Sequence, residues 1–163
     1  MRWIWIDTFV DFVSGQRASA IKNVTRAEEH AHDYVPGFPV LPPSLMIEGM
    51  AQTAGILVGE ARGFKEKVIL AKVREASFTD YAGPGDQLRY DATLESIDAR
   101  AAMTTGTVMK NQLPIGKVDL IFSHVDQAER RLDLPDHNFV FTDTFRDLLA
   151  GFQRGASSAG RAS

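Results

Sequence analysis

The segment that most constrains this chain is YVPGFPVLPP, residues 34–43, together with the apolar run that follows it. Four prolines and one glycine within these ten residues exclude a helix interior and a central strand, because proline lacks the backbone N–H that both need. A stiff, extended loop is therefore predicted. The next run, SLMIEGMAQTAGILVGE at residues 44–60, is apolar almost all round, which is typical of a buried helix. Pro43 and Ser44 suit the start of this helix, and Gly63 suits its end.

Most of the remaining chain has the pattern of β-strands. Residues 3–13 and 18–25 are rich in β-favouring side chains and flank Ser14 and Gly15, which predicts a hairpin. Four further runs follow the helix, with turns at 81–86, 96–100 and 111–114: residues 67–78, 87–97, 101–110 and 115–125. Sequential strands with short connections favour an antiparallel meander. The predicted fold class is α+β, with a long central helix wrapped by one curved antiparallel sheet of about six strands.

The C-terminal part differs from this unit. Residues 142–152 carry Phe145, Leu148, Leu149 and Phe152 at helical spacing, which predicts a short amphipathic helix. We expect it to pack on its own domain, with a sheet edge or a groove of a neighbouring chain as alternatives. Gly, Ser and Ala dominate residues 155–163, a composition typical of a flexible tail. The predicted division is a domain at 1–130, an extension at 131–154 and a tail at 155–163.

The overall composition excludes several classes of function. The chain has 163 residues, which suits one domain, and it has no cysteine, so a disulfide framework and a cysteine nucleophile are excluded. A net charge of −3 argues against nucleic-acid binding. No apolar run has the length of about 18 residues that a membrane span needs, and the N-terminus lacks the pattern of a signal peptide. A cytoplasmic protein is expected.

One stripe of polar side chains interrupts the apolar helix. Ser44, Glu48 and Gln52 are spaced by four and therefore share one face. Because burial of a carboxyl group favours its protonated form, a carboxyl on a buried helix is a natural general acid near neutral pH. The alternative is that Glu48 forms a salt bridge with an arginine or reaches solvent. From the helix pattern alone, both interpretations stay open.

The loop before the helix and the nearby histidines are weaker signals. A proline-stiffened loop that leads into a helix N-terminus directs backbone N–H groups at an anion or a carbonyl, and Gly37 permits close approach of a ligand. The alternative is a connector without a ligand. Upstream, His30 and His32 offer a base, but the sequence shows no third ligand at a spacing that would suit a metal. His124 and His137 are expected to be structural or surface residues.

Taken together, these residues resemble the β-hydroxyacyl-acyl-carrier-protein dehydratases. Five short motifs carry the resemblance over residues 4–125: AIKNVT (20–25), PGFPVLP (36–42), LMIEGMAQ (45–52), ASF (76–78) and GPGD (83–86). The resemblance implies a hot-dog fold and a homodimer or a trimer of dimers, with no metal or organic cofactor. It also implies a substrate whose acyl chain is a thioester of acyl carrier protein or coenzyme A, in fatty acid or related acyl-chain biosynthesis.

The resemblance also assigns roles to individual residues. In the family, a histidine from the loop of one protomer and a carboxylate from the helix of its partner form the site. Glu48 matches that carboxylate, Gln52 the polar residue beside it, and Gly37 the glycine whose N–H faces the thioester carbonyl. Pro36 and Phe38 flank this glycine. Both are expected to contact the substrate, as are Gly37 and Gln52.

Two positions depart from the family pattern. The histidine of the family stands three residues before the glycine, where this chain has Tyr34, and Pro43 replaces a glycine. A neutral phenol, with a pKa of about 10 in general, is a poor acceptor of an α-proton. Three interpretations follow: His32 reaches the site instead, Tyr34 acts as a hydrogen-bond donor, or dehydration is lost while acyl binding persists. The alternatives to a dehydratase are accordingly a non-catalytic acyl-thioester-binding subunit and a hot-dog thioesterase.

Overall fold

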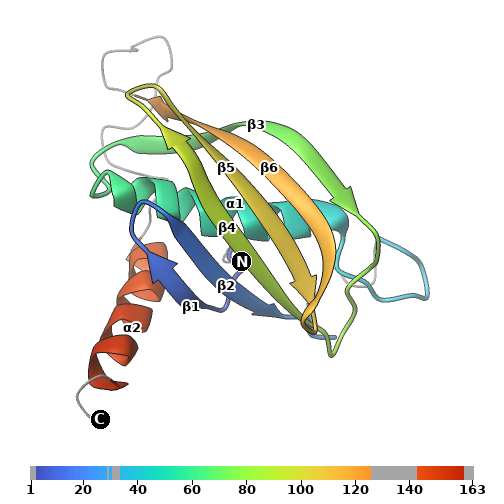
Figure 1. Ribbon diagram of the computed structural model, residues 1–163. Coiled ribbons are helices and arrows are strands. Elements are labelled where there is room, and N and C mark those ends of the chain that lie inside the picture. The colour runs from blue at the N-terminus through green and yellow to red at the C-terminus, as the bar shows by residue number, and fades with distance from the viewer. Residues whose placement is uncertain (1–2, 29, 31–33, 126–142, 160–163) are drawn as a thin grey trace.

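The computed structural model describes residues 3–28, 30, 34–125 and 143–159 (Figure 1). It contains two helices and six strands within these ranges. In chain order they are β1 (Thr8–Val13), β2 (Arg17–Asn23), α1 (Pro43–Ala61), β3 (Lys67–Phe78), β4 (Gln87–Ile97), β5 (Ala101–Lys110), β6 (Leu113–Val125) and α2 (Asp143–Ala159). The predicted α+β class, with a long helix against one antiparallel sheet, is confirmed.

The six strands form one sheet in the order β1-β2-β4-β5-β6-β3, with all pairs antiparallel. Only β4, β5 and β6 are a simple meander, so the prediction of a meander throughout is wrong. Because α1 is inserted between β2 and β3, the chain crosses the sheet there, and β3 joins at the far edge beside β6. Figure 1 shows α1 lying across one face of the sheet, which it contacts through β2, β3, β4, β5 and β6.

Helix α1 is almost wholly buried, as its apolar sequence predicts. Pro42 is its N-cap, and Pro43 occupies the first turn, where a missing N–H costs nothing. Its end is set by Gly63, whose φ of 63° lets the chain turn back so that the N–H of Phe64 donates to the carbonyl of Gly59 at 2.8 Å. Most of its apolar side chains are buried in the hydrophobic core, among them those of Met46, Met50 and Leu57.

Three strands differ from the predicted bounds. Strand β2 runs over Arg17–Asn23 instead of 18–25. Strand β1 begins at Thr8 instead of Trp3, because the residues before it lie against α1 and the N–H of Trp5 donates to the Gln52 side chain. Strand β6 begins at Leu113 instead of 115, because Asn111 and Gln112 alone make the turn after β5. Their φ angles of 48° and 73° are those of a two-residue hairpin turn that matches the twist of the sheet.

The C-terminal helix α2 packs on its own domain beside β1 (Figure 1). Leu149 is buried in the common core, and Phe145, Leu148 and Phe152 pack against it. The helix continues to Ala159, past the end predicted at 152 and into the predicted tail, because no proline interrupts its backbone hydrogen bonds. None of the helices in the described part of the chain is long and apolar enough to cross a membrane.

Candidate functional site

Glu48 lies on α1 and is half-buried, with its carboxyl group held by two neutral donors. Its Oε1 atom accepts a hydrogen bond from Nε1 of Trp3 at 3.1 Å and another from Nε2 of Gln52 at 2.9 Å. Among the described residues, Glu48 forms no salt bridge, so the alternative of an arginine partner is not what the structure shows. The carboxyl group is thus fixed by hydrogen bonds on one oxygen and partly open to solvent.

Gln52 ties this part of α1 to the segment before β1. Its side chain is buried, and its Oε1 atom accepts a hydrogen bond from the N–H of Trp5 at 2.8 Å. Its Nε2 atom donates to the carbonyl of Trp3 at 3.2 Å as well as to Glu48. The amide of Gln52 therefore binds both the Glu48 carboxyl group and the backbone of the segment before β1. Ser44, predicted on the same stripe, is exposed at the start of α1.

The proline-rich loop presents its tip outward. Gly37 has a φ of 79°, in the region that favours glycine, and no atom lies within 4 Å of the position that a Cβ would occupy. Tyr34, Pro36 and Phe38 are exposed around it, with Phe38 at 58%. A backbone bridge between Leu41 and Ala82 anchors the end of the loop to the sheet side. Within one chain, no hydrogen bond or ion pair between described residues joins this tip to Glu48.

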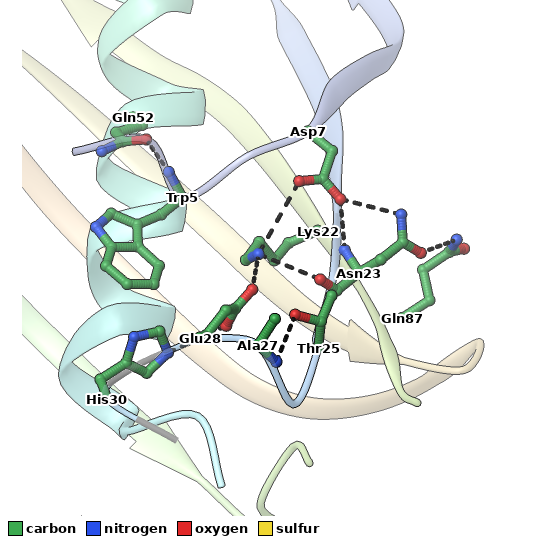
Figure 2. A network of polar contacts seen from close by, with 10 residues as sticks. All are labelled: Trp5, Asp7, Lys22, Asn23, Thr25, Ala27, Glu28, His30, Gln52 and Gln87. Carbon is green, nitrogen blue, oxygen red and sulfur yellow. Dashed lines mark hydrogen bonds and ion pairs between the residues drawn. The ribbon is translucent and has the colours of Figure 1, made fainter. Parts of the chain in front are cut away.

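The histidines divide into two described and two outside the described residues. His30 packs edge-on against Trp5, with ring centroids 4.7 Å apart, and its Nε2 atom lies 3.1 Å from a carboxylate oxygen of Glu28 (Figure 2). His124 is buried on β6 and pairs through Nδ1 with Glu66. This agrees with its expected structural role. His32, a predicted site residue, and His137 lie outside the described residues.

Glu28, which lies beside His30, also pairs with a buried cation. Lys22 is only 8% exposed, and its ammonium group pairs with Glu28 and lies 4.0 Å from Asp7 (Figure 2). Asp7 in turn accepts hydrogen bonds from the backbone and side-chain N–H groups of Asn23, at 2.7 and 3.0 Å. This network fastens the start of the chain to β2. No group of three metal-ligating side chains occurs in the described part of the chain.

Sequence reasoning did not identify Trp3 and Trp5 as residues of the site. Both lie in MRWIWID, where they were attributed to the first strand. The available signal was their spacing of two, which places both indoles on one side of an extended segment. The two rings do meet edge-on, with centroids 5.2 Å apart. What the sequence could not show is that this side faces α1, 45 residues away.

The sequence matches known proteins over most of its length. The profile of the FabA-like domain matches residues 4–117. The 3-hydroxyacyl-[acyl-carrier-protein] dehydratase FabZ of Caldanaerobacter subterraneus is 30% identical over 74% of this chain and 86% of its own length. The FabZ of Granulibacter bethesdensis is 40% identical over 55% of this chain. That match spans about half of the relative, 54% of its length.

Solved structures agree on the fold. The dehydratase heterocomplex ApeI:P from Xenorhabdus doucetiae superposes with a TM-score of 0.66 at 17% identity, covering 78% of this chain and 87% of the other. A Streptococcus mutans protein bound to acetyl-CoA gives 0.56 at 14% identity, covering 72% and 87%. At such identities the likeness concerns the fold alone. Because the domain profile spans residues 4–117, which include α1 and all of β1 to β5, and a FabZ relative is 30% identical over 86% of its own length, this chain belongs to the FabA-like family of hot-dog dehydratases.

Proposed function

We propose that this protein acts on 3-hydroxyacyl thioesters as a dehydratase, with Glu48 as its acid. The observation that carries the proposal is the carboxyl group of Glu48, which is anchored through Oε1 while Oε2 accepts no hydrogen bond from the described residues. An anchored, half-buried carboxyl group on a rigid helix is suited to proton transfer, because its geometry is fixed before the substrate arrives.

The proposed reaction removes water across C2 and C3 of the acyl chain. A base takes the α-proton, the electron pair of that C–H bond forms the C2=C3 double bond, and the C3–O bond breaks. Oε2 of Glu48 gives its proton to the departing hydroxyl, which leaves as water. The N–H of Gly37 is proposed to bind the thioester oxygen, where negative charge develops.

Tyr34 determines how the base must be supplied. A neutral phenol donates a hydrogen bond readily but accepts an α-proton poorly. We therefore propose that Tyr34 donates to the thioester or to the 3-hydroxyl group, and that His32 takes the α-proton. The same substitution favours a second candidate function, an acyl-thioester-binding subunit that holds the substrate without turnover.

The loop and Glu48 are proposed to meet across two copies of the chain. The tip around Gly37 is exposed and makes no polar contact with Glu48 of its own chain within the described residues. Strand β3 forms one edge of the sheet, and it exposes apolar side chains there, including Leu70 at 40% and Val73 at 41%. Pairing of two β3 edges would continue the sheet and bring the loop of one copy toward α1 of the other.

The test is incubation of the purified protein with a 3-hydroxyacyl thioester of acyl carrier protein and, separately, of coenzyme A. Dehydration appears as the ultraviolet absorbance of the conjugated enoyl thioester, and hydrolysis appears as free thiol. We expect dehydration by the wild type and none by Glu48→Gln, which keeps the shape of the side chain but cannot supply the proton.

Two further variants separate the candidates. His32→Gln should abolish turnover if His32 is the base. If the wild type binds the thioester but is inactive, and Tyr34→His gains dehydration, the binding subunit is supported instead. Thiol release that depends on Glu48 would show a thioesterase and contradict the proposal.

A further inference from the structure

We propose that Trp3 is a positioning residue for Glu48. The indole N–H of Trp3 binds one carboxylate oxygen of Glu48 and so leaves the other oxygen to exchange a proton. This inference rests on the proposed function of Glu48, and it adds a residue that lies outside the loop and the helix. The family profile begins at residue 4, so the profile match does not include Trp3.

The hydrogen bonds at Glu48 are asymmetric. Both donors, the indole of Trp3 at 3.1 Å and the amide of Gln52 at 2.9 Å, point at Oε1. A carboxylate oxygen has two lone pairs in its plane, so two donors occupy its accepting capacity. Oε2 is then the oxygen left to hold a proton and to pass it to a substrate.

The position of Trp3 is itself well supported. Gln52 donates to the carbonyl of Trp3 at 3.2 Å, and it accepts from the N–H of Trp5 at 2.8 Å. Trp5 is 8% exposed, and its ring contacts those of Trp3 and His30, with centroid distances of 5.2 and 4.7 Å. Trp3 is thus held at its backbone and on one edge of its ring.

The exposure of Trp3 argues against a role in the core. Its side chain is 57% exposed, so the ring contributes little apolar burial to the fold. An indole N–H on an exposed ring needs no protein partner, because water can satisfy it. That it donates to the one carboxyl group of the proposed site is therefore best explained by an effect on that carboxyl group.

Trp5 supplies a matched control. Its Nε1 atom is buried and has no hydrogen-bond partner among the described residues, whereas Nε1 of Trp3 bonds to Glu48. Changing either residue to Phe removes one indole N–H and keeps an aromatic ring. We expect Trp3→Phe to lower kcat by about 10-fold to 100-fold with KM changed less than about threefold, since one hydrogen bond to a charged group is lost. Trp5→Phe should lose at least about fivefold less in kcat.

A second readout does not depend on turnover. The two indole N–H groups give separate ¹⁵N-correlated NMR resonances, and Trp5→Phe assigns them by removing one. Glu48→Ala should move the Trp3 resonance strongly and leave that of Trp5 nearly in place. Thermal unfolding of Trp3→Phe should match the wild type to within about 2 °C, because little buried surface changes.

The outcomes distinguish this inference from the proposed function. If the wild type dehydrates and Trp3→Phe is no slower than Trp5→Phe, Trp3 is not a positioning residue and the function of Glu48 stands. If the wild type does not turn over, the proposed function fails, and the NMR shift alone decides whether Trp3 holds Glu48. An unmoved Trp3 resonance in Glu48→Ala overturns the inference in either case.

Discussion

The close approach of Tyr90 to Gly49 of α1 predicts the effect of adding a single methyl group. A Cβ atom at Gly49 would lie 2.4 Å from Cζ of Tyr90 and 2.6 Å from its hydroxyl oxygen. Ordinary contact begins at 3.4 Å, so the ring would have to retreat by about 1 Å. Tyr90 is fully buried, and a packed core resists such a shift.

The magnitude follows from two opposing terms. Overpacking a core costs about 1–3 kcal/mol, and a rigid ring in a full core belongs at the upper end of that range. Alanine favours a helix over glycine by about 1 kcal/mol. We therefore expect Gly49→Ala to lower the free energy of unfolding by about 1–2 kcal/mol.

Gly55 on the same helix is the matched control, since its Cβ would meet nothing closer than 3.5 Å. Gly55→Ala should raise the free energy of unfolding by about 0.5–1 kcal/mol. Urea unfolding followed by circular dichroism, at one fixed protein concentration, measures both variants. Equal stability of the two variants would refute the reasoning. So would failure of Tyr90→Leu to rescue Gly49→Ala in a double-mutant cycle.

Two further predictions concern buried polar groups. Lys22→Met should lower the free energy of unfolding by about 3 kcal/mol, because it leaves the carboxylate of Glu28 without its ammonium partner. The additional change Glu28→Gln should recover part of this loss, as measured by urea unfolding. Burial, aided by the negative charges of Glu28 and Asp7, raises the pKa of the Tyr90 phenol above its usual value, so the phenol keeps its proton in the folded state after the unfolded chain has ionised. Its contribution to stability is therefore present below about pH 10 and is lost as the pH rises further, and Tyr90→Phe should flatten the alkaline fall of the unfolding midpoint.

The elements that could be predicted from the sequence are those whose signals are local. The apolar run at 44–60 and the glycine at 63 place α1 to within a residue or two, and β3, β4 and β5 begin and end where their side-chain patterns indicate. The order of the strands in the sheet could not be predicted from such local signals. Nothing near β3 indicates that it pairs with β6 instead of β4, because that choice depends on where the chain emerges after α1.

The site was predictable in its parts but not in its contacts. Glu48 and Gln52 stand out because polar side chains are rare on α1. Their partner Trp3 could not be found in this way, since a Trp in a β-favouring run has the pattern of an ordinary strand residue. The role proposed for the exposed loop tip at Gly37 depends on a second copy of the chain, and a single sequence does not describe an interface between copies.

Helix α2 has a consequence for assembly. A curved sheet with two uncovered edge strands can pair with further copies at both edges and so grow into a filament. Here α2 lies against the edge strand β1, where another strand would have to add, and Leu149 of α2 is buried in the core. Strand addition is then left to the opposite edge, formed by β3, where the proposed pairing of two β3 strands would leave neither edge free. Such a dimer cannot grow further by strand addition while α2 covers β1. Truncating α2 should therefore favour open-ended polymers.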